Sequence, residues 1–164
     1  MDGMSIDTER FKDLMSNVAA TVTVVTAPSD DGPIGITVSA FTSVSADPPI
    51  VLMCIDKVAG SLAQFLAAPG FTVNFMPEGA EDSTMVFATR GADKFGTVEW
   101  REPVTASAGP VLEEAFQVLE CETVEQTEMG DHWVIYGRVV AETGEAGVPL
   151  VYFNRNFAKL SVPN

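Results

Sequence analysis

Three short segments of the chain combine small and polar side chains in a way that suits ligand binding. The first, residues 35–49, reads GITVSAFTSVSADPP and places five hydroxyl groups within residues 37–45. Small side chains let backbone N–H groups approach a ligand closely, and the hydroxyls can hydrogen-bond a polar heterocycle edge or a phosphate. The alternative is an exposed strand followed by a turn rich in serine and threonine, which composition alone favours.

The second segment, residues 53–61, reads MCIDKVAGS and passes from an apolar strand into a helix that begins at Ser61. A helix N-terminus with Lys57 close by would attract an anion. The alternative is an ordinary strand-to-helix connection with Ser61 as its N-cap. Cys54 is a poor candidate for a nucleophile, because it lies within the apolar strand and no Cys-His-Asn order is evident.

The third segment is Gly130-Asp131-His132, which contains the single histidine of the chain. His132 could donate a hydrogen bond to a flavin or a nicotinamide, or it could be a surface residue beside a glycine turn. One histidine excludes a multi-histidine metal site within one chain. The sequence has neither the G-x-S-x-G pattern of a serine nucleophile nor the G-x-G-x-x-G pattern of a Rossmann nucleotide site.

The charge of the chain excludes several kinds of partner. Nine basic and twenty-three acidic residues give a net charge of −14, which repels nucleic acid and anionic lipid. Four of the nine bases nevertheless fall in the middle of the chain: Lys57, Arg90, Lys94 and Arg101. If they converge, an anionic ligand could bind there; the alternative is a set of scattered, solvated bases.

The chain begins with a predicted helix and continues mainly as strands. Residues 8–19 show apolar residues at helical spacing (Phe11, Leu14, Met15, Val18), with Asp7 as N-cap, and we expect this stripe to pack in the core. After residues 34–39 we expect a loop that ends at Pro48-Pro49. The other predicted elements are strands at 21–27, 34–39, 50–55, 71–76, 115–127, 132–142 and 148–153, helices at 61–67 and 81–90, and mostly loop at 91–111.

Hairpins dominate this pattern and no βαβ alternation occurs, which predicts a mainly β fold: an antiparallel barrel with helices packed outside it. A length of 164 residues predicts a single domain. The longest apolar run, residues 50–55, is too short to cross a bilayer, and the charged start lacks the apolar stretch of a secretory signal. Two cysteines are too few for a disulfide scaffold, so we expect a cytoplasmic protein with free thiols.

Six segments of the chain, in order, resemble the flavin reductase-like family, the small NAD(P)H:flavin oxidoreductases of two-component monooxygenases. The resemblance covers about residues 8–160. In chain order the segments are GITVSAFTSVSADPP, IVLMCIDK with Ser61, FTVNFM, DKFGTVEW, GDHWVIYGRV and PLVYF.

The resemblance implies an FMN-binding split β-barrel of Greek-key type with short flanking helices. It also implies a homodimer that holds FAD or FMN in a groove at the dimer interface, with NADH or NADPH as the hydride donor. Reduced flavin would diffuse to a partner monooxygenase, and neither nucleic acid nor a membrane would be a partner. Hydride transfer needs stacked rings and no acid–base pair, so we expect no catalytic side chain.

Residue by residue, the resemblance implies four groups of cofactor contacts. Thr37, Val38, Ser39 and Ala40 resemble the segment along the isoalloxazine ring, and Cys54, Ile55, Asp56, Lys57 and Ser61 the segment at the ribityl chain and phosphates. Phe87, Ala88, Lys94 and Phe95 match the region that covers the flavin. His132 resembles the residue near the nicotinamide, and Tyr152 lies in the matching terminal strand.

The chain departs from the family after its last strand. Family members often have Arg-Gly-Gly-Tyr there, whereas this chain has Asn154-Arg155-Asn156-Phe157. We therefore assign Arg155 to no phosphate. The sequence leaves open FAD against FMN, and the missing arginine cluster for a 2′-phosphate favours NADH over NADPH. The alternative function is a flavin carrier or sensor without nicotinamide turnover.

Overall fold

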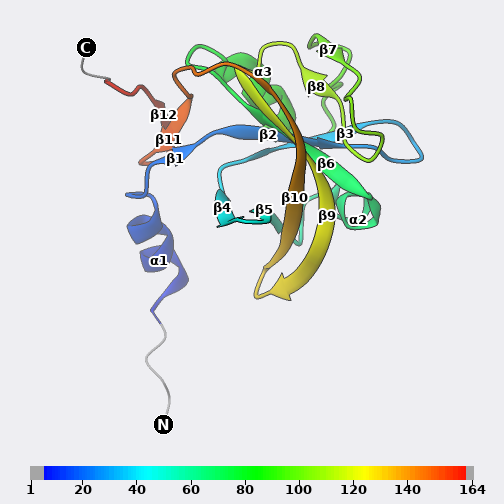
Figure 1. Ribbon diagram of the computed structural model, residues 1–164. Helices are drawn as coiled ribbons and strands as arrows, with labels where there is room; N and C mark the ends of the chain where they lie inside the picture. Colours follow the sequence, from blue (N-terminus) through cyan, green and yellow to red (C-terminus); the bar gives the residue numbers. More distant parts are fainter. Residues whose placement is uncertain (1–5, 162–164) are drawn as a thin grey trace.

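A seven-stranded antiparallel sheet organises the protein in the computed structural model, which describes residues 6–161 (Figure 1). The strands lie in the order β3-β2-β6-β9-β10-β5-β4. Their bounds are β2 Thr23–Ala27, β3 Ile34–Val38, β4 Phe41–Ala46, β5 Pro49–Asp56, β6 Gly70–Phe75, β9 Gln117–Met129 and β10 His132–Gly144. The prediction of a mainly β, antiparallel fold with short helices is confirmed.

The two edge strands of this sheet are consecutive in the chain. β3 lies at one edge and β4 at the other, yet only Ser39 and Ala40 separate them. The Ala40 carbonyl accepts a hydrogen bond from the Cys54 amide, 3.0 Å away, which fixes the connection against β5. The sheet therefore has to curl until the end of β3 reaches the start of β4, which shapes it into a barrel although these two strands are not paired with each other.

Strand β2 is buried on both of its faces, because the sheet packs against a core on each side. Val25 belongs to the cluster inside the barrel, with Met53, Phe71 and Ile135, and none of these side chains is exposed by more than 1%. Val24, its neighbour, points the opposite way into a second cluster outside the barrel. The alternation of side chains along a strand explains this division.

Within residues 6–161, three helices and two small sheets complete the fold. The helices are α1 (Thr8–Met15), α2 (Leu62–Ala67) and α3 (Glu81–Ala88). One small sheet joins β1 (Ala20–Thr21), β11 (Val151–Phe153) and β12 (Asn156–Ala158), and the other joins β7 (Trp100–Arg101) and β8 (Val111–Leu112). No helix within residues 6–161 is long and apolar enough to cross a membrane.

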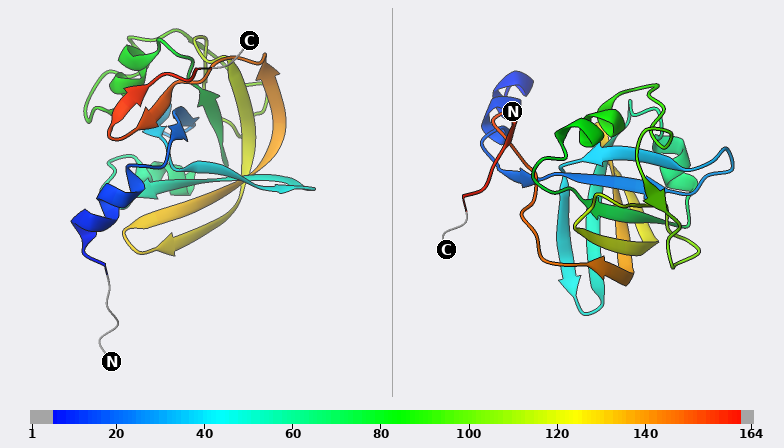
Figure 2. Two further views of the ribbon diagram at one scale, coloured as in Figure 1. Left: turned by 90° about the vertical axis from the view of Figure 1, so that its left-hand side faces the viewer. Right: turned by 90° about the horizontal axis from the view of Figure 1, so that it is seen from above.

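The apolar stripe of α1 does not pack in the core, so that prediction is wrong. The helix lies away from the barrel in two perpendicular views (Figures 1 and 2), and Phe11, Leu14 and Met15 are each about half exposed. Asp7 does cap the helix, because its carboxylate accepts from the Arg10 amide at 3.2 Å. The helix ends at Met15, before the predicted end, so Val18 lies outside it.

Besides the two-residue strands β7 and β8, two strands lie where none was predicted. Residues 41–46, expected as loop, form β4, whose hydroxyl-rich and mostly exposed side chains lack the apolar alternation of a half-buried strand. Residues 156–158 form β12 against β11, after a turn in which Asn154 and Arg155 both have positive φ. The predicted strand 148–153 is shorter, at residues 151–153, and the other predicted strands agree within a few residues.

The long segment 91–111 is mostly loop, as predicted, and buried threonines fix its end to the barrel. Thr26 Oγ1 donates to the Pro110 carbonyl at 2.6 Å, and Thr72 Oγ1 donates to the Gly109 carbonyl at 2.6 Å. Glu120, which is buried, accepts from the amides of Val104 and Thr105. A Cβ at Gly109 would lie 2.4 Å from the backbone of Ala27, so only glycine fits this close approach.

We expect Gly109→Ala to destabilise the protein by about 1–3 kcal/mol, because its Cβ would collide with backbone that cannot move independently of β2. Gly60→Ala is the matched control, since a Cβ there meets no atom within 4 Å. Urea unfolding followed by circular dichroism measures both. Equal stabilities of the two variants would contradict this account of Gly109.

Candidate functional site

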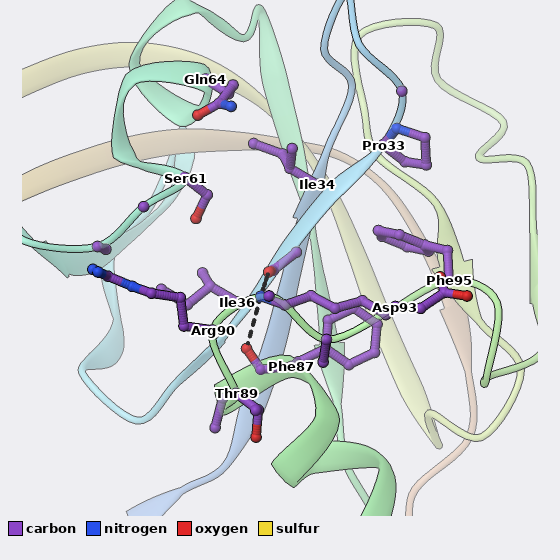
Figure 3. A pocket seen from close by; sticks show the side chains of 18 of the residues that line it. Pro33, Ile34, Ile36, Ser61, Gln64, Phe87, Thr89, Arg90, Asp93 and Phe95 are labelled. Atoms are coloured by element: carbon purple, nitrogen blue, oxygen red, sulfur yellow. Dashed lines mark hydrogen bonds between the residues drawn. The ribbon is translucent and has the colours of Figure 1, made fainter.

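A cleft of about 730 Å³ opens on the outside of the barrel beside β3. Three segments form it: the start of β3 with the turn before it, the connection from β5 into α2, and the chain that follows α3. Figure 3 shows Ile34 and Ile36 of β3 between Ser61 and Gln64 on one side and Phe87 and Phe95 on the other. The lining residues are 31–36, Asp56, 58–61, Gln64 and 87–95.

The wall between β3 and α3 is aromatic because a glycine allows the two elements to approach. A Cβ on Gly35 would lie 2.6 Å from Cε1 of Phe87, so the Phe87 ring occupies the space that a side chain would need. Phe87 packs edge-to-face against Phe95 with ring centroids 5.4 Å apart, and Phe95 packs in the same way on Trp100. The result is a rigid apolar surface on which a flat ligand can lie.

Lys94 connects the same two elements by hydrogen bonds. Its ammonium donates to the Gly35 carbonyl at 2.7 Å and to the Phe87 carbonyl at 3.1 Å. Burial lowers the pKa of Lys94, because partial removal from water disfavours its charged form. The lysine thus contributes both a positive charge and a cross-link to this wall of the cleft.

The opposite wall contains polar groups at the start of α2. The Asp56 carboxylate accepts from the Val58 amide at 2.9 Å, which turns the chain out of β5. Ser61 occupies the N-cap position, as predicted, but its hydroxyl makes no capping hydrogen bond. Figure 3 shows this hydroxyl and the Gln64 amide beside the cleft, where both can form hydrogen bonds with a ligand.

The structure brings six of the residues that the resemblance implied into this cleft, and all six lie on its walls. They are Asp56, Ser61, Phe87, Ala88, Lys94 and Phe95. They come from two segments separated in sequence, which fits the prediction that the segments act at one site.

The first segment, residues 37–40, runs from the edge of the cleft to the barrel closure. Thr37 Oγ1 donates to the Thr84 carbonyl at 2.6 Å, so this hydroxyl also joins β3 to α3. Val38 is buried in the barrel core, while Ser39 and Ala40 are exposed in the connection. Ile55 is likewise a core side chain, and only its backbone is available to a ligand.

The second and third segments lie side by side at the end of β5. His132 pairs with Asp56 across the β5–β10 ladder, and the Lys57 amide donates to the Asp131 carbonyl at 2.9 Å. His132 Nδ1 lies 2.7 Å from the Asp131 carboxylate, and this hydrogen bond lowers the pKa of Asp131. Lys57 forms an ion pair with Glu128 and is not part of the cleft wall.

Two further predicted residues, like Lys57, do not line the cleft in this chain. Cys54 is half-buried on β5, where burial raises the pKa of its thiol and so lowers the fraction present as the nucleophilic thiolate. Tyr152 lies in β11, partly exposed, and packs edge-to-face on Phe157 with ring centroids 5.9 Å apart. Neither side chain lines the cleft.

Sequence reasoning missed several lining residues, among them Ile34, Ile36, Gln64 and Arg90. Of the four central bases, whose convergence would suit an anion, the structure brings Arg90 and Lys94 into the cleft, but not Lys57 and Arg101. Arg101 lies elsewhere, 3.7 Å from the Glu113 carboxylate. The close approach of Gly35 to Phe87 of α3 joins positions 52 residues apart, so the sequence alone offers no signal for it.

Comparisons with known proteins agree on one family. The model described as the flavin reductase like domain matches residues 15–161. The actinorhodin polyketide dimerase of Streptomyces coelicolor is 39% identical over 96% of this chain and 89% of its own length. The flavin reductase (NADH) of Kitasatospora aureofaciens is 35% identical over 96% of this chain and 84% of its own length.

Two further proteins are similar to this chain, one in sequence and one in its solved structure. The reductase component of 4-nitrophenol 4-monooxygenase/4-nitrocatechol 2-monooxygenase from Rhodococcus opacus is 36% identical over 93% of this chain and 80% of its own. The solved structure of the Streptomyces globisporus NADH:FAD oxidoreductase SgcE6 superposes with a TM-score of 0.89 at 30% identity, covering 99% of both chains. A second structure of that protein holds NAD and FAD fragments.

We expect Lys94→Met to lower the free energy of unfolding by about 1–3 kcal/mol, because it leaves the Gly35 and Phe87 carbonyls without their donor. The matched control is Lys159→Met, which removes only an exposed pair with Glu78 and should cost less than about 1 kcal/mol. Urea unfolding measures the difference. A Lys94 variant no less stable than the control would show that the cross-link does not stabilise the wall.

Proposed function

Because the chain belongs to the flavin reductase-like family, we propose that the cleft beside β3 is the flavin site of an NAD(P)H:flavin oxidoreductase. The chain is a flavin reductase, since its relatives and structural neighbours carry that activity in their names. It supplies reduced flavin to a separate monooxygenase component. The single observation that carries the cleft assignment is the convergence of six motif residues on its walls.

The residues present fit a flavin by their chemistry. Phe95, Ile34 and Ile36 supply apolar surface for a ring system, with the buried Phe87 ring behind them, and Ser61 with Gln64 supplies hydroxyl and amide groups for a polyol chain. The backbone N–H groups of Ser39 and Ala40, in the exposed connection after β3, can donate to the polar edge of the ring, whereas the carbonyls of Val38, Ser39 and Ala40 already accept hydrogen bonds within the protein. When bound, the flavin accepts a hydride from the nicotinamide, and the protein has only to hold the two rings together.

The second cofactor is proposed to approach from the side of His132. Its ring lies beside Asp56 across the β5–β10 ladder, and Asp131 fixes its orientation through Nδ1. An imidazole held in this way can orient a carboxamide or a phosphate without exchanging a proton during hydride transfer. The roles of His132, Cys54, Lys57 and Tyr152 remain predictions from the family pattern.

An activity assay tests this function directly. We expect nicotinamide oxidation, followed by the loss of absorbance of the reduced form, when FAD or FMN is present and little oxidation without flavin. NADH should be preferred over NADPH, because the cleft contains one arginine and no arginine cluster for a 2′-phosphate. Absence of turnover with every pair of FAD, FMN or riboflavin with NADH or NADPH would contradict the proposal.

We further propose that the protein is a homodimer with the cleft close to the interface. In support, the apolar side of α1 is exposed in the single chain, and edge strand β4 has a free side with Val44 half exposed. Burial of such surface in a second copy is favourable, because it removes apolar area from water. The dimer would also bring groups of a second chain to residues such as Tyr152 that the single chain leaves apart.

Analytical ultracentrifugation at micromolar concentration is expected to give a sedimentation coefficient for twice the mass of 17.5 kDa. Leu14→Glu on α1 should shift the equilibrium towards monomer, because it introduces a charge into the exposed apolar stripe. Arg10→Glu, on the same helix but outside the stripe, is the control. An active wild-type protein that sediments as a monomer would refute the dimer.

A further inference from the structure

Helix α1 is attached to the rest of the chain by its polar side. Asp13, on that side, accepts a hydrogen bond from Nη2 of Arg155 at 2.5 Å, and the two side chains form an ion pair. Where the helix ends, the Ser16 carbonyl accepts from the Asn154 amide at 2.8 Å. Both contacts come from the turn between β11 and β12, called the 154–155 turn below, which therefore fixes the end of α1.

The apolar stripe of α1 lies on the other side of the helix. Phe11, Leu14 and Met15 are each about half exposed. At 100° per residue, their stripe is centred about 150° around the helix from Asp13. An amphipathic helix normally buries its apolar face against its own protein, whereas Figure 2 shows α1 projecting away from the barrel. The chain thus holds this helix by its polar side and presents the apolar stripe to another molecule.

The 154–155 turn has an uncommon backbone conformation. Asn154 and Arg155 have φ of 50° and 62°, in the left-handed region that asparagine tolerates and arginine rarely adopts. The Asn156 side-chain amide closes the turn by donating to the Asn154 carbonyl at 2.8 Å. This is the segment in which the chain departs from the family pattern, and the proposed flavin site assigns it no role. Its one visible effect is to hold α1.

A second apolar surface lies on the outer face of β5 and β10. Four partly exposed side chains lie side by side there: Leu52 and Cys54 of β5, with Tyr136 and Val134 opposite them on β10. Because Met53 points into the barrel core, the alternation of a strand places its neighbours on the outside. Within residues 6–161, α2 packs on the inner cluster and α3 on β2 and β3, so neither helix covers this face.

The size of the stripe on α1 fits a second copy of the chain. Five side chains at this end are about half exposed: Ile6, Phe11, Leu14, Met15 and Val18. Together they leave about 400–500 Å² of apolar surface in water, the size of the largest patch on a typical monomer. In a twofold-symmetric dimer the same contact forms twice. Counting both partners, two such contacts bury about 1,600–2,000 Å², which is the size of a stable interface.

We propose that the 154–155 turn holds α1 in the orientation in which its apolar stripe binds a second copy of this chain, on the outer face of β5 and β10. This inference rests on the proposed homodimer and gives a role to the segment that departs from the family pattern. β5 ends at Asp56, which lines the cleft. The helix of one copy therefore lies beside the proposed flavin site of the other.

The experiment reverses the charges of the ion pair between α1 and the turn. Sedimentation velocity over a dilution series gives the Kd of the dimer. We expect Asp13→Arg to raise this Kd by about 5-fold or more, because like charges replace the ion pair at both helices of the dimer. The double variant Asp13→Arg with Arg155→Asp, which restores the pair in reverse, should return the Kd to within about twofold of the wild type.

The matched control is Glu9→Arg, which makes the same change of charge on the same side of α1. Glu9 pairs with Lys12 and does not touch the 154–155 turn. Arginine is favourable near a helix C-terminus and unfavourable near its N-terminus, so helix stability alone would weaken the control more than Asp13→Arg. We expect the Kd of the control to stay within about twofold of the wild type. Circular dichroism confirms that each variant is folded.

Two results would overturn the role of the turn while leaving the homodimer intact: a wild-type dimer Kd in Asp13→Arg, or an equal rise in Glu9→Arg. Leu52→Glu, on the outside of the barrel, should weaken the dimer as Leu14→Glu does. A wild-type Kd in a folded Leu52→Glu variant would overturn the binding of α1 to β5 and β10. A wild-type protein that stays monomeric would overturn the homodimer and this inference together, and the nicotinamide oxidation assay would still decide the reductase function separately.

Discussion

The connection of two residues between β3 and β4 constrains the whole barrel. The Cα atoms of Val38 and Phe41 can be at most about 11 Å apart, yet these residues end and begin the two opposite edge strands of a seven-stranded sheet. The sheet can satisfy this only by curling until the end of β3 lies next to the start of β4. Closure buries the inner face around Met53 and Ile135 and leaves the outer face of β3 to be covered by α3.

The cleft is a consequence of that closure. β3 enters the connection at Val38, so its earlier residues, from Ile34 to Ile36, lie against the end of β5 on one side and α3 on the other. Gly35 and Lys94 then determine how closely α3 can approach. A ligand placed here would contact three segments far apart in sequence, and the proposed flavin site therefore needs no Rossmann fold.

The sequence predicted β2, β6 and the β9–β10 hairpin well. These strands have runs of apolar and β-branched residues that end at turn residues, and such runs are typical of buried strands. β4 escaped prediction because an exposed strand rich in hydroxyls has no apolar face to reveal it. The stripe of α1 was recognised as helical, but periodicity does not specify the surface against which a helix packs. The sequence could not show which of the four central bases lies in the cleft. The position of Arg90 on the cleft wall depends on the folded structure.

The pairing of β1 with β11 joins Ala20 to Tyr152 and Thr21 to Val151, while the Val22 amide donates to the Leu150 carbonyl. β2, the direct continuation of β1, pairs with β3 and β6 much nearer in the chain. During synthesis on a ribosome, β1 therefore cannot pair with β11 until nearly the whole chain has emerged, because contacts between distant segments form last. The small sheet of β1, β11 and β12 is therefore expected to be the last part of the fold to form.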